Sequence, residues 1–492
     1  MQNPLESSPD SPYITLIMPM TNEEFRKHAH EMVDWMADFY EHIDQYPVRS
    51  TSQPGDILAQ LPPHAPEKGE PYDRIFEDFQ KIILPGMTHW QSPSFFAYFP
   101  GNSSPPSVLA EMITATLGAQ CMSWVTSPAA TELEERVMEW LRDMIGLPPK
   151  FEGVIQDTAS TATLCAILNA REKHSGFAVN RRGLSPERRF TVYCSSEAHS
   201  SVEKAVGIAG IGRDHLRKIA VDSNFAMRAE ELDRVVNEDK AQGFTPLCVV
   251  AALGTTGSTA VDPLAPIAKI CRRHGVWLHV DAAYAGTALV LPEYRHMLEG
   301  IDQADSFVFN PHKWMFTNFD CSAYFVRDRE ALLRTFEILP EYLKTTERDP
   351  VKNYRDWGIQ LGRRFRALKL WFVIRTYGVE GIKQRVREHI ELARTLERRM
   401  SATPGFELLA PMQFNVLCFR FHPAGMNDGE QLNALNASLL ERLNATGKLF
   451  LTHTKLDGRY TLRLVIAQTN VEARHVDQAW TLIQEKAREL TA

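Results

Sequence analysis

Short, nearly uninterrupted apolar runs, separated by helical patterns, restrict the fold of this chain more than any other feature. Helical periodicity covers Thr161–Arg171 and Pro263–His274. Strands that are apolar at successive positions are typical of a parallel sheet with helices on both faces. The pattern therefore predicts an α/β fold with a mostly parallel central sheet flanked by helices. The predicted strands are Phe190–Tyr193, Leu247–Leu253, Val276–Val280 and Ser306–Phe309.

A helix is predicted to begin near Thr21, upstream of the sheet. Thr21 and Glu24 have the spacing of a capping box, and apolar residues follow at helical intervals. His28 and His30 lie two residues apart in this helix, so they face different sides and are predicted to be surface histidines rather than metal ligands. The segment from Gln45 to Tyr72 is rich in Pro and Gly, which indicates an extended connection.

The C-terminal part has a different pattern. A long helix is predicted at Arg363–Tyr377, and short strands at Asn415–Phe421 and Tyr460–Ile466. This mixture indicates a smaller α+β domain. We therefore expect an N-terminal helical segment (1–104), a large α/β domain (105–370) and a small C-terminal domain (371–492).

Composition excludes several classes of partner. The chain has 492 residues and a net charge of −7, which argues against nucleic acid or an anionic membrane as the main partner despite a few Arg-rich patches. The seven cysteines form no CxxC pair and lie mostly in apolar runs, as expected in a reducing compartment. No signal peptide or membrane span is evident. A cytoplasmic protein without a metal site is predicted.

Polar residues follow the predicted strands directly. Asp281 ends one strand, and Lys313 lies just beyond another; His199 and Thr256 follow the remaining two. In open α/β sheets, the carboxyl edge of the strands is where ligands bind. Considered alone, Asp281 could equally be a turn residue, and Lys313 could be an ordinary lysine on the solvated surface.

Together, these residues match the requirements of a single cofactor. Pyridoxal phosphate requires a lysine for its aldehyde, an anion beside its ring nitrogen, a phosphate site and a flat group against its ring. Lys313, Asp281 and His199 provide the first, second and fourth of these. Asp157–Ser160 precedes a predicted helix, and the N–H groups of a helix N-terminus bind phosphate. Pyridoxal 5'-phosphate is therefore the predicted cofactor.

From about Thr21 to the C-terminus, an ordered set of motifs resembles the group II pyridoxal-phosphate decarboxylases, most closely the aromatic-L-amino-acid decarboxylases. The resemblance implies fold-type I architecture and an obligate homodimer with active sites at the subunit interface, with the N-terminal helix wrapped on the partner. The motifs are HWQSPSFFAYFP (89–100), SPAATELEERVMEWL (127–141), GVIQDTAS (153–160), EAHSSVEKA (197–205), WLHVDAAYAG (277–286), NPHKW (310–314) and WGIQLGRRFRALKLWF (357–372).

The resemblance also implies roles for individual residues. Lys313 would carry the cofactor, Asp281 would pair with the ring nitrogen and His199 would stack on the ring. Tyr342 matches the tyrosine of the family's mobile catalytic loop. The remaining cofactor contacts would be Ala159, Ser160, Asn310 and His312 around the phosphate, Thr256 near the ring and Ala283 beneath it.

The side-chain pocket implied by the resemblance has an aromatic wall of Tyr98, Phe99 and Pro100. Gly101, Gln120 and Met122 depart from the animal family pattern, which leaves the ring preference open. Gly362 replaces a Ser found in relatives that prefer histidine, and in some plant relatives that prefer tyrosine, and would leave space for an indole or a substituted ring.

The resulting prediction is α-decarboxylation of an aromatic L-amino acid (the Trp, 5-hydroxy-Trp, DOPA, Tyr or Phe class) to the arylalkylamine and CO2. One alternative is an aromatic aldehyde synthase, which also deaminates the product oxidatively. Such relatives usually lose the loop tyrosine or the stacking histidine, whereas Tyr342 and His199 are both present. A catalytically silent homologue is a second alternative, and it is disfavoured because Lys313 and Asp281 are retained.

Overall fold

The computed structural model describes residues 20–185, 187–338 and 351–491. By its internal contacts the chain divides into two compact units, residues 1–89 and 90–492. None of the helices in the described ranges is long and apolar enough to cross a membrane. The domain boundaries expected at residues 104 and 370 remain predictions.

The first unit contains helix α1 (Asn22–Glu41) and the short helix α2 (Tyr72–Asp78). The predicted capping box is present: the Glu24 N–H donates to Thr21 Oγ1 (3.2 Å), and the Thr21 N–H donates to the Glu24 carboxylate (2.8 Å). In the predicted connection from Gln45 to Tyr72, the longest regular element is a single 3-10 turn at Leu58–Gln60. The helix start and the connection are therefore confirmed.

One histidine of α1 differs from its prediction. His30 is exposed, as expected, but the His28 side chain is only 12% exposed. It packs on the Tyr72 ring (centroids 4.3 Å apart) and pairs with Glu31 (3.0 Å) and Asp73 (3.5 Å). The prediction of a surface position was wrong for His28 because the covering helix α2 lies far away in sequence.

The second unit is built on a seven-stranded sheet of order β1-β7-β6-β5-β4-β2-β3. Neighbours from β6 to β3 are parallel, and only β7 runs against its two neighbours. The mostly parallel sheet is confirmed; the antiparallel β7 was not predicted. The strands are β1 (Glu152–Gln156), β2 (Phe190–Ser195), β3 (Leu216–Ile219), β4 (Thr245–Ala252), β5 (Trp277–Asp281), β6 (Ser306–Phe309) and β7 (Ser322–Val326).

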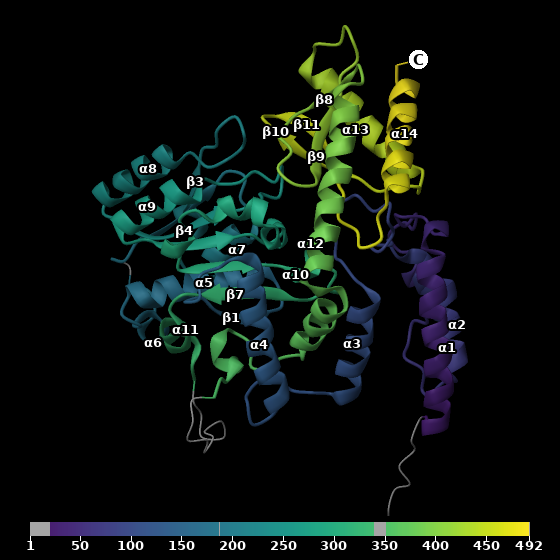
Figure 1. The fold of residues 1–492 in the computed structure, drawn as a ribbon, viewed down its shortest axis with the longest axis horizontal. Coiled ribbons are helices and arrows are strands. Elements are labelled where there is room, and N and C mark those ends of the chain that lie inside the picture. Colours follow the sequence, from purple (N-terminus) through teal and green to yellow (C-terminus); the bar gives the residue numbers. More distant parts are fainter. Residues whose placement is uncertain (1–19, 186, 339–350, 492) are drawn as a thin grey trace, which may run out of the picture. The chain divides into compact units, whose positions relative to one another are not determined.

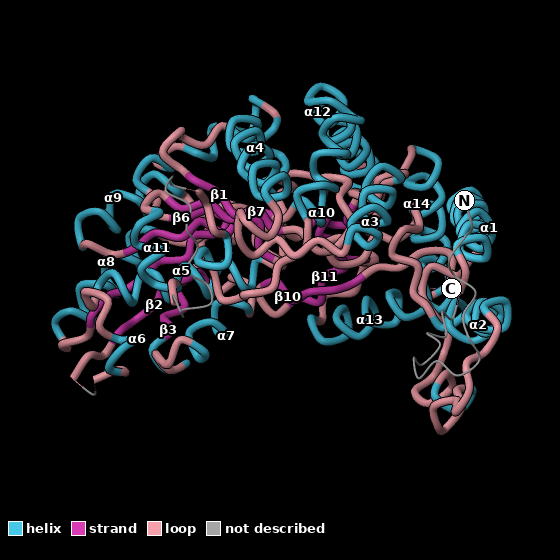
Figure 2. Tube along the Cα trace, turned by 90° about the horizontal axis from the view of Figure 1, so that it is seen from below, coloured by secondary structure: helices cyan, strands magenta, loops and turns pink. Residues whose placement is uncertain are grey.

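Helices cover both faces of this sheet (Figure 1). Alternate residues of a strand point to opposite faces, so Val249 packs in one hydrophobic cluster with α8 and α9, whereas Val250 packs in another with α5 and α7. In Figure 2 the strands run between helices on both sides. This double cover explains why the strands are apolar throughout. The helices are α3 (Pro105–Leu117), α4 (Pro128–Ile145), α5 (Ala159–His174), α6 (Val179–Arg182), α7 (Ser201–Ile208), α8 (Ala229–Ala241), α9 (Leu264–His274), α10 (Pro311–Trp314) and α11 (Arg329–Phe336).

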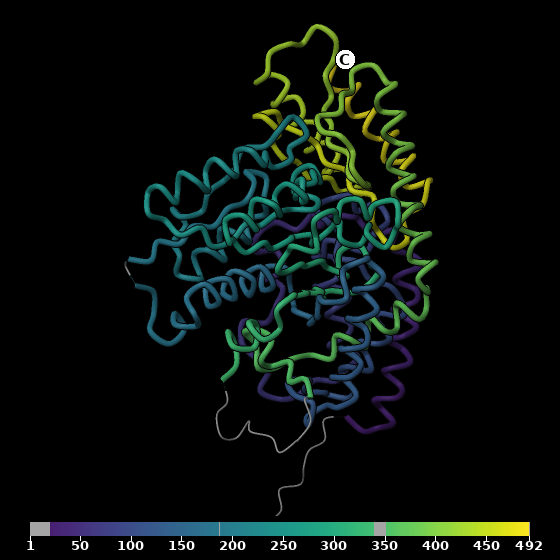
Figure 3. Tube along the Cα trace, turned by 60° about the vertical axis from the view of Figure 1, so that its left-hand side comes forward, coloured from purple at the N-terminus to yellow at the C-terminus, as the bar shows by residue number. Residues whose placement is uncertain are grey.

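The C-terminal part forms a second sheet, antiparallel throughout, of order β10-β11-β9-β8. Helix α12 (Arg366–Ser401) leads to it from the large sheet (Figure 3). The helix predicted at Arg363–Tyr377 is the first half of α12, which kinks at Gly378, where φ is 65° and ψ is 166°. The remaining elements are β8 (Phe406–Leu408), β9 (Val416–Phe421), α13 (Gly429–Ala445), β10 (Thr452–Leu456), β11 (Arg459–Val465) and α14 (Ala473–Glu489).

Candidate active site

The carboxyl ends of the parallel strands meet around one cavity of about 240 Å³. Strand β5 ends at Asp281, β6 leads into α10, and the chain leaving β2 and β4 supplies further residues. All nine residues predicted to bind the cofactor line this cavity; their roles remain predictions. They are Ala159, Ser160, His199, Thr256, Asp281, Ala283, Asn310, His312 and Lys313.

Lys313 lies in the single turn of α10, directly beyond β6. Burial lowers the pKa of its ammonium group, as does the neighbouring Arg463, while Asp281 acts in the opposite direction. Its Nζ atom lies 5.2 Å from the centre of the Phe99 ring. A lysine with a lowered pKa is a better nucleophile near neutral pH, because more of its amine is unprotonated.

Asp281 is the last residue of β5, and its Oδ1 accepts the N–H of Ala283 (3.0 Å). Within the described part of the chain, no hydrogen-bond partner is found for Oδ2 of Asp281. This oxygen is therefore available to a positively charged or N–H-bearing group of a ligand in the cavity.

The opposite wall is the N-terminus of α5. Thr158 caps the helix by accepting the N–H of Thr161, and Ala159 and Ser160 open it. The first N–H groups of a helix lack partners within the helix and attract anions. Asn310 is held in place by the Ser322 hydroxyl, which donates to its Oδ1 (2.7 Å).

His312 completes this side of the cavity as a neutral ring. Its Nδ1 accepts the backbone N–H of Cys321 (2.8 Å), and burial lowers its pKa to about 3. Because Nδ1 is an acceptor, the single proton of the ring is on Nε2. His312 is therefore a hydrogen-bond donor rather than a cation.

The residues predicted to contact the substrate side chain do not all line the cavity. Phe99 lines the cavity, while its neighbours Tyr98, Pro100 and Gly101 do not. Gln120, Met122 and Gly362 also lie outside it. Gln120 and Gly362 are adjacent: a Cβ atom built on Gly362 would lie 3.3 Å from Gln120 Nε2, and both residues are exposed. Tyr342 lies outside the described residues.

Arg463 was missed by the sequence analysis. It lies on β11, only 4% exposed, with its guanidinium 5.3 Å from the Phe99 ring centre. Its Nε donates to the Gly257 carbonyl (2.8 Å), but one terminal nitrogen is buried without a hydrogen-bond partner, and within the described ranges no carboxylate pairs with the group. A charge within a short apolar run, Leu462-Arg463-Leu464-Val465, was the signal that would have identified it.

Phe99 is the first of three stacked aromatic rings, and the other two support it from behind. The Phe99 and Tyr284 rings are 3.9 Å apart and nearly parallel, and Tyr284 stacks in turn on Trp314 at 5.1 Å. The Tyr284 hydroxyl donates to Asn415 Oδ1 (2.8 Å), so the stack is tied to the C-terminal sheet. This packing makes Phe99 a rigid flat wall.

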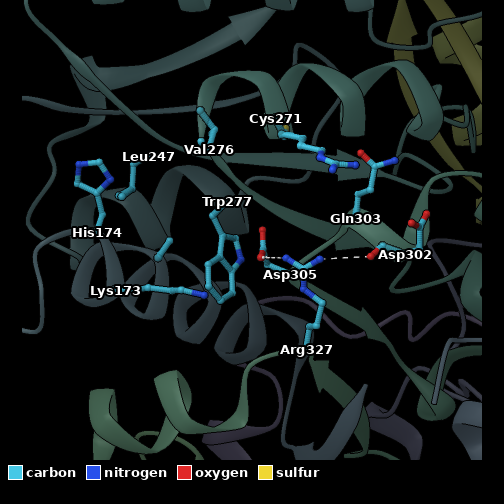
Figure 4. A pocket seen from close by; sticks show the side chains of 13 residues that line it. Lys173, His174, Leu247, Cys271, Val276, Trp277, Asp302, Gln303, Asp305 and Arg327 are labelled. Atoms are coloured by element: carbon cyan, nitrogen blue, oxygen red, sulfur yellow. Dashed lines mark hydrogen bonds and ion pairs between the residues drawn. The ribbon is translucent and has the colours of Figure 1, made fainter. Parts of the chain in front are cut away.

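A second and larger cavity, of about 510 Å³, lies at the opposite edge of the sheet (Figure 4). It contains Trp277 at the start of β5, and its charged groups are mostly paired. Arg327 bonds to Asp305 (2.7 Å), and Lys173 bonds to Asp328 (2.8 Å). None of the predicted site residues that the structure describes lines this cavity, so its size does not make it the candidate active site.

Comparison with known proteins identifies the family. The model described as the pyridoxal-dependent decarboxylase conserved domain matches residues 54–422. The chain belongs to this family. A phenylacetaldehyde synthase from Arabidopsis thaliana is 45% identical over 482 residues (96% of this chain, 97% of the relative). Tyrosine decarboxylase 2 from Narcissus pseudonarcissus is 43% identical over 486 residues (97% and 96%).

Solved structures of decarboxylases agree with this assignment and with the predicted fold-type I architecture. Catharanthus roseus tryptophan decarboxylase in complex with L-tryptophan superposes with a TM-score of 0.90 at 39% identity, covering 96% of this chain and 99% of that chain. Oryza sativa TDC with PLP and tryptamine superposes with a TM-score of 0.93 at 35% identity, with the same coverage.

The residues of the cavity fit pyridoxal phosphate, the cofactor of this decarboxylase family. The N-terminus of α5, with the Nε2–H group of His312, matches the phosphate. The unpartnered Oδ2 of Asp281 matches the ring nitrogen, and the partly desolvated amine of Lys313 matches the aldehyde. The phosphate, the ring nitrogen and the aldehyde of the cofactor therefore each have a complementary group in one cavity.

Proposed function

We propose that the chain catalyses the α-decarboxylation of an aromatic L-amino acid to its arylalkylamine and CO2. The observation that supports this most is that Lys313, Asp281 and the N-terminus of α5 share one cavity with an aromatic wall. When bound, pyridoxal phosphate supplies an electron sink for the electron pair that remains at Cα when CO2 leaves.

Lys313 and Asp281 have complementary tasks in this proposal. Asp281, fixed by the Ala283 N–H, keeps a proton on the ring nitrogen of the cofactor by its negative charge. Lys313 would hold the aldehyde of the bound cofactor and would be displaced from it by the substrate amine. Its lowered pKa favours the exchange, because a larger fraction of the amine is unprotonated than for an exposed lysine.

Arg463 is proposed to bind the carboxylate of the incoming amino acid. Arg463 lies behind Phe99 rather than among the residues that line the cavity, but a buried guanidinium without an anionic partner is unfavourable, and a carboxylate would satisfy its unpartnered nitrogen. Both Arg463 and Lys313 lie about 5 Å from the Phe99 ring centre (5.3 and 5.2 Å). Arg463 also lowers the pKa of Lys313 by its charge, so the two groups are near each other, and a substrate with its carboxylate at Arg463 would place its amine toward Lys313.

Phe99 is proposed to set the substrate class. Its ring is held flat by the stack on Tyr284, so an aromatic side chain gains face contact at little conformational cost. The residues Tyr98, Pro100, Gly101, Gln120, Met122 and Gly362 remain proposed contributors to the same pocket.

Tyr342 is proposed to deliver the proton to Cα after CO2 has left. An aldehyde synthase is the second candidate, since a phenylacetaldehyde synthase is 45% identical to this chain. The two functions differ in whether Cα is protonated or oxidised by O2. The presence of Tyr342 and His199 supports protonation and hence release of the amine.

A homodimer is also proposed. Leu109, Ile113 and Leu117 follow one another at four-residue intervals on α3 and are 41–62% exposed, which makes an unusually apolar stripe. Gln120 and Gly362 lie outside the cavity of their own chain and are exposed. These residues support an interface through which a second copy completes the side-chain pocket.

Complementation between two inactive variants tests this interface. Lys313→Ala removes the amine, and Gly362→Trp blocks the pocket that the second copy would complete. Mixed dimers would contain one intact site, so random exchange should restore roughly a quarter of the parent activity. A mixture that stays inactive although mixed dimers form would contradict a shared site.

A reducing, cytoplasmic location is proposed for the enzyme. All seven cysteines are buried and none forms a disulfide. Buried thiols without disulfides are typical of proteins from reducing compartments.

One assay tests the proposed function. Purified holoenzyme is incubated with L-Trp, L-5-hydroxy-Trp, L-DOPA, L-Tyr and L-Phe, and CO2, amine, aldehyde and peroxide are measured separately. We expect equal amounts of amine and CO2 from at least one substrate. Aldehyde with peroxide as the main product would support the second candidate, and absence of CO2 from every substrate would overturn both.

A further inference from the structure

His199 is anchored to the first residue of α7 by two hydrogen bonds. The backbone N–H of Ser201 donates to His199 Nδ1 at 3.2 Å, and the Ser201 hydroxyl lies 2.8 Å from the same nitrogen. Both residues line the cavity around Lys313. Ser201 is only 4% exposed, so water does not compete strongly for its side chain.

The direction of these bonds determines where the ring proton lies. A backbone N–H is always a donor, so Nδ1 must accept with its lone pair and carries no proton. The hydroxyl of Ser201 then also donates to Nδ1. A neutral imidazole has one proton, which is left on Nε2, at the side of the ring away from α7.

The charges around His199 favour the same neutral form. Partial burial lowers the pKa of His199 most, and Lys313 on α10 and Lys204 on α7 lower it further. Asp281 on β5 acts in the opposite direction. The positive end of α7, whose first N–H group is already bonded to the ring, also disfavours a cation there.

We infer that Ser201 is a positioning residue, which fixes His199 as a neutral ring that carries its proton on Nε2. The position of the proton does not depend on the proposed function. Only the role of the Nε2–H group, as a hydrogen-bond donor to the reacting substrate, rests on the proposed function. His312 in the same cavity has the same arrangement, because the Cys321 N–H bonds to its Nδ1. Two neutral N–H donors would thus face one cavity.

A consequence for the pH dependence follows. Protonation of His199 would place a proton on Nδ1, directly against the backbone N–H of Ser201, and the Ser201 hydroxyl would have to turn from donor to acceptor. The bonds from Ser201 therefore favour the neutral ring and keep its pKa low. Activity that needs the anchored ring is complete above this pKa and is lost as the pH falls through it.

A neutron crystal structure of the perdeuterated holoenzyme at neutral pH tests the proton position directly. We expect deuterium on Nε2 of His199 and none on Nδ1. His312 is an internal reference for the same arrangement. Deuterium on Nδ1 of His199, or on both nitrogens, would overturn the inference.

The role of the Ser201 hydroxyl is tested by the acidic limb of kcat/KM. Ser201→Ala removes one of the two donors to Nδ1. The apparent pKa of the acidic limb should therefore rise by roughly half a pH unit to one unit. Ser201→Thr keeps a hydroxyl and should restore the parent profile. Ser200→Ala is the matched control, because Ser200 precedes α7, is exposed and makes no side-chain cap.

An acidic limb that does not move in Ser201→Ala would show that Ser201 does not position His199. A limb that moves equally in Ser200→Ala would assign the effect to the helix end instead. Failure of the proposed function has a different signature: no aromatic amino acid would yield CO2, while the deuterium on Nε2 would still be seen.

Discussion

Phe99 and Tyr284 stack face to face, with ring centroids 3.9 Å apart and an interplanar angle of 11°. Tyr284 is buried and bonded to Asn415, so the position of Phe99 is set from behind by a residue that follows β5 and a residue that precedes β9. The flat wall of the cavity is therefore held rigid, and we expect differences in substrate preference to arise at the residues around it.

The attachment of the cofactor to Lys313 is open to a direct chemical test. Borohydride reduction of the holoenzyme should fix the pyridoxyl group on Lys313 and block tryptic cleavage there. Mass spectrometry should then find the group on the uncleaved peptide His296–Arg327, in which Lys313 is the only lysine. The Lys313→Ala variant is the control, and a pyridoxyl mass on another peptide of the parent enzyme would contradict the assignment.

Asp281→Asn should lower kcat by roughly 100-fold to 1,000-fold, because a neutral amide does not hold a proton on the ring nitrogen of the cofactor. The amide can still accept the Ala283 N–H, so the fold and the melting temperature should change little. Steady-state kinetics and thermal unfolding check the two expectations. Turnover close to that of the parent would show that Asp281 does not act on the cofactor.

Arg463→Gln should raise KM for the amino acid by about 10-fold to 100-fold, since a charge-assisted bond to the carboxylate is lost. Tryptamine lacks the carboxylate, so its inhibition constant should stay close to that of the parent. Arg463→Lys retains the charge and should recover part of the loss. Equal weakening of substrate and tryptamine would mean that Arg463 only supports the fold.

Gly362→Ser should lower kcat/KM for L-Trp more than for L-Phe, by roughly 10-fold. The added Cβ would lie 3.3 Å from Gln120 Nε2, so the two residues must rearrange at the edge of the proposed pocket. Gly429→Ser is the control, because a Cβ there meets no atom within 4 Å. The same loss for both substrates would remove Gly362 from the side-chain pocket.

Tyr342→Phe should keep CO2 release but replace most of the amine by aldehyde, ammonia and peroxide. The ring is retained while the proton donor is lost, so Cα is exposed to O2 for longer. Separate assays of CO2, amine and O2 uptake check this change. If the variant still makes amine at nearly the parent rate, the proton comes from another group, with His199 the next to test.

Local patterns predicted the large sheet well where strands were apolar and ended at a polar residue. Strand β6 was predicted with its observed bounds, Ser306–Phe309, because Asn310-Pro311 follows it. Strand β7, at Ser322–Val326, is equally apolar but was missed, and nothing in its sequence encodes its reversed direction. Strand direction depends on the path of the connection, which is a property of the whole fold.

The candidate site shows the same contrast between residues that local sequence predicts and residues that it does not. Residues just past a strand end, such as Asp281 and Lys313, were predictable because strand ends meet at one edge. Arg463 comes from the other sheet, and its neighbour Phe99 precedes both sheets in the chain, so no local spacing relates the two. The Ser201–His199 bonds likewise depend on hydrogen-bond direction, which a motif does not show.

The bond from Arg463 Nε to the Gly257 carbonyl joins the C-terminal sheet to the loop that follows β4 of the large sheet. The proposed carboxylate-binding group therefore has its position fixed by a backbone atom of the domain that holds Lys313. Recombination between relatives is constrained by this contact. A chimaera that takes its C-terminal sheet from one parent and its large sheet from another should keep this contact only if the loop at Gly257 keeps its backbone conformation.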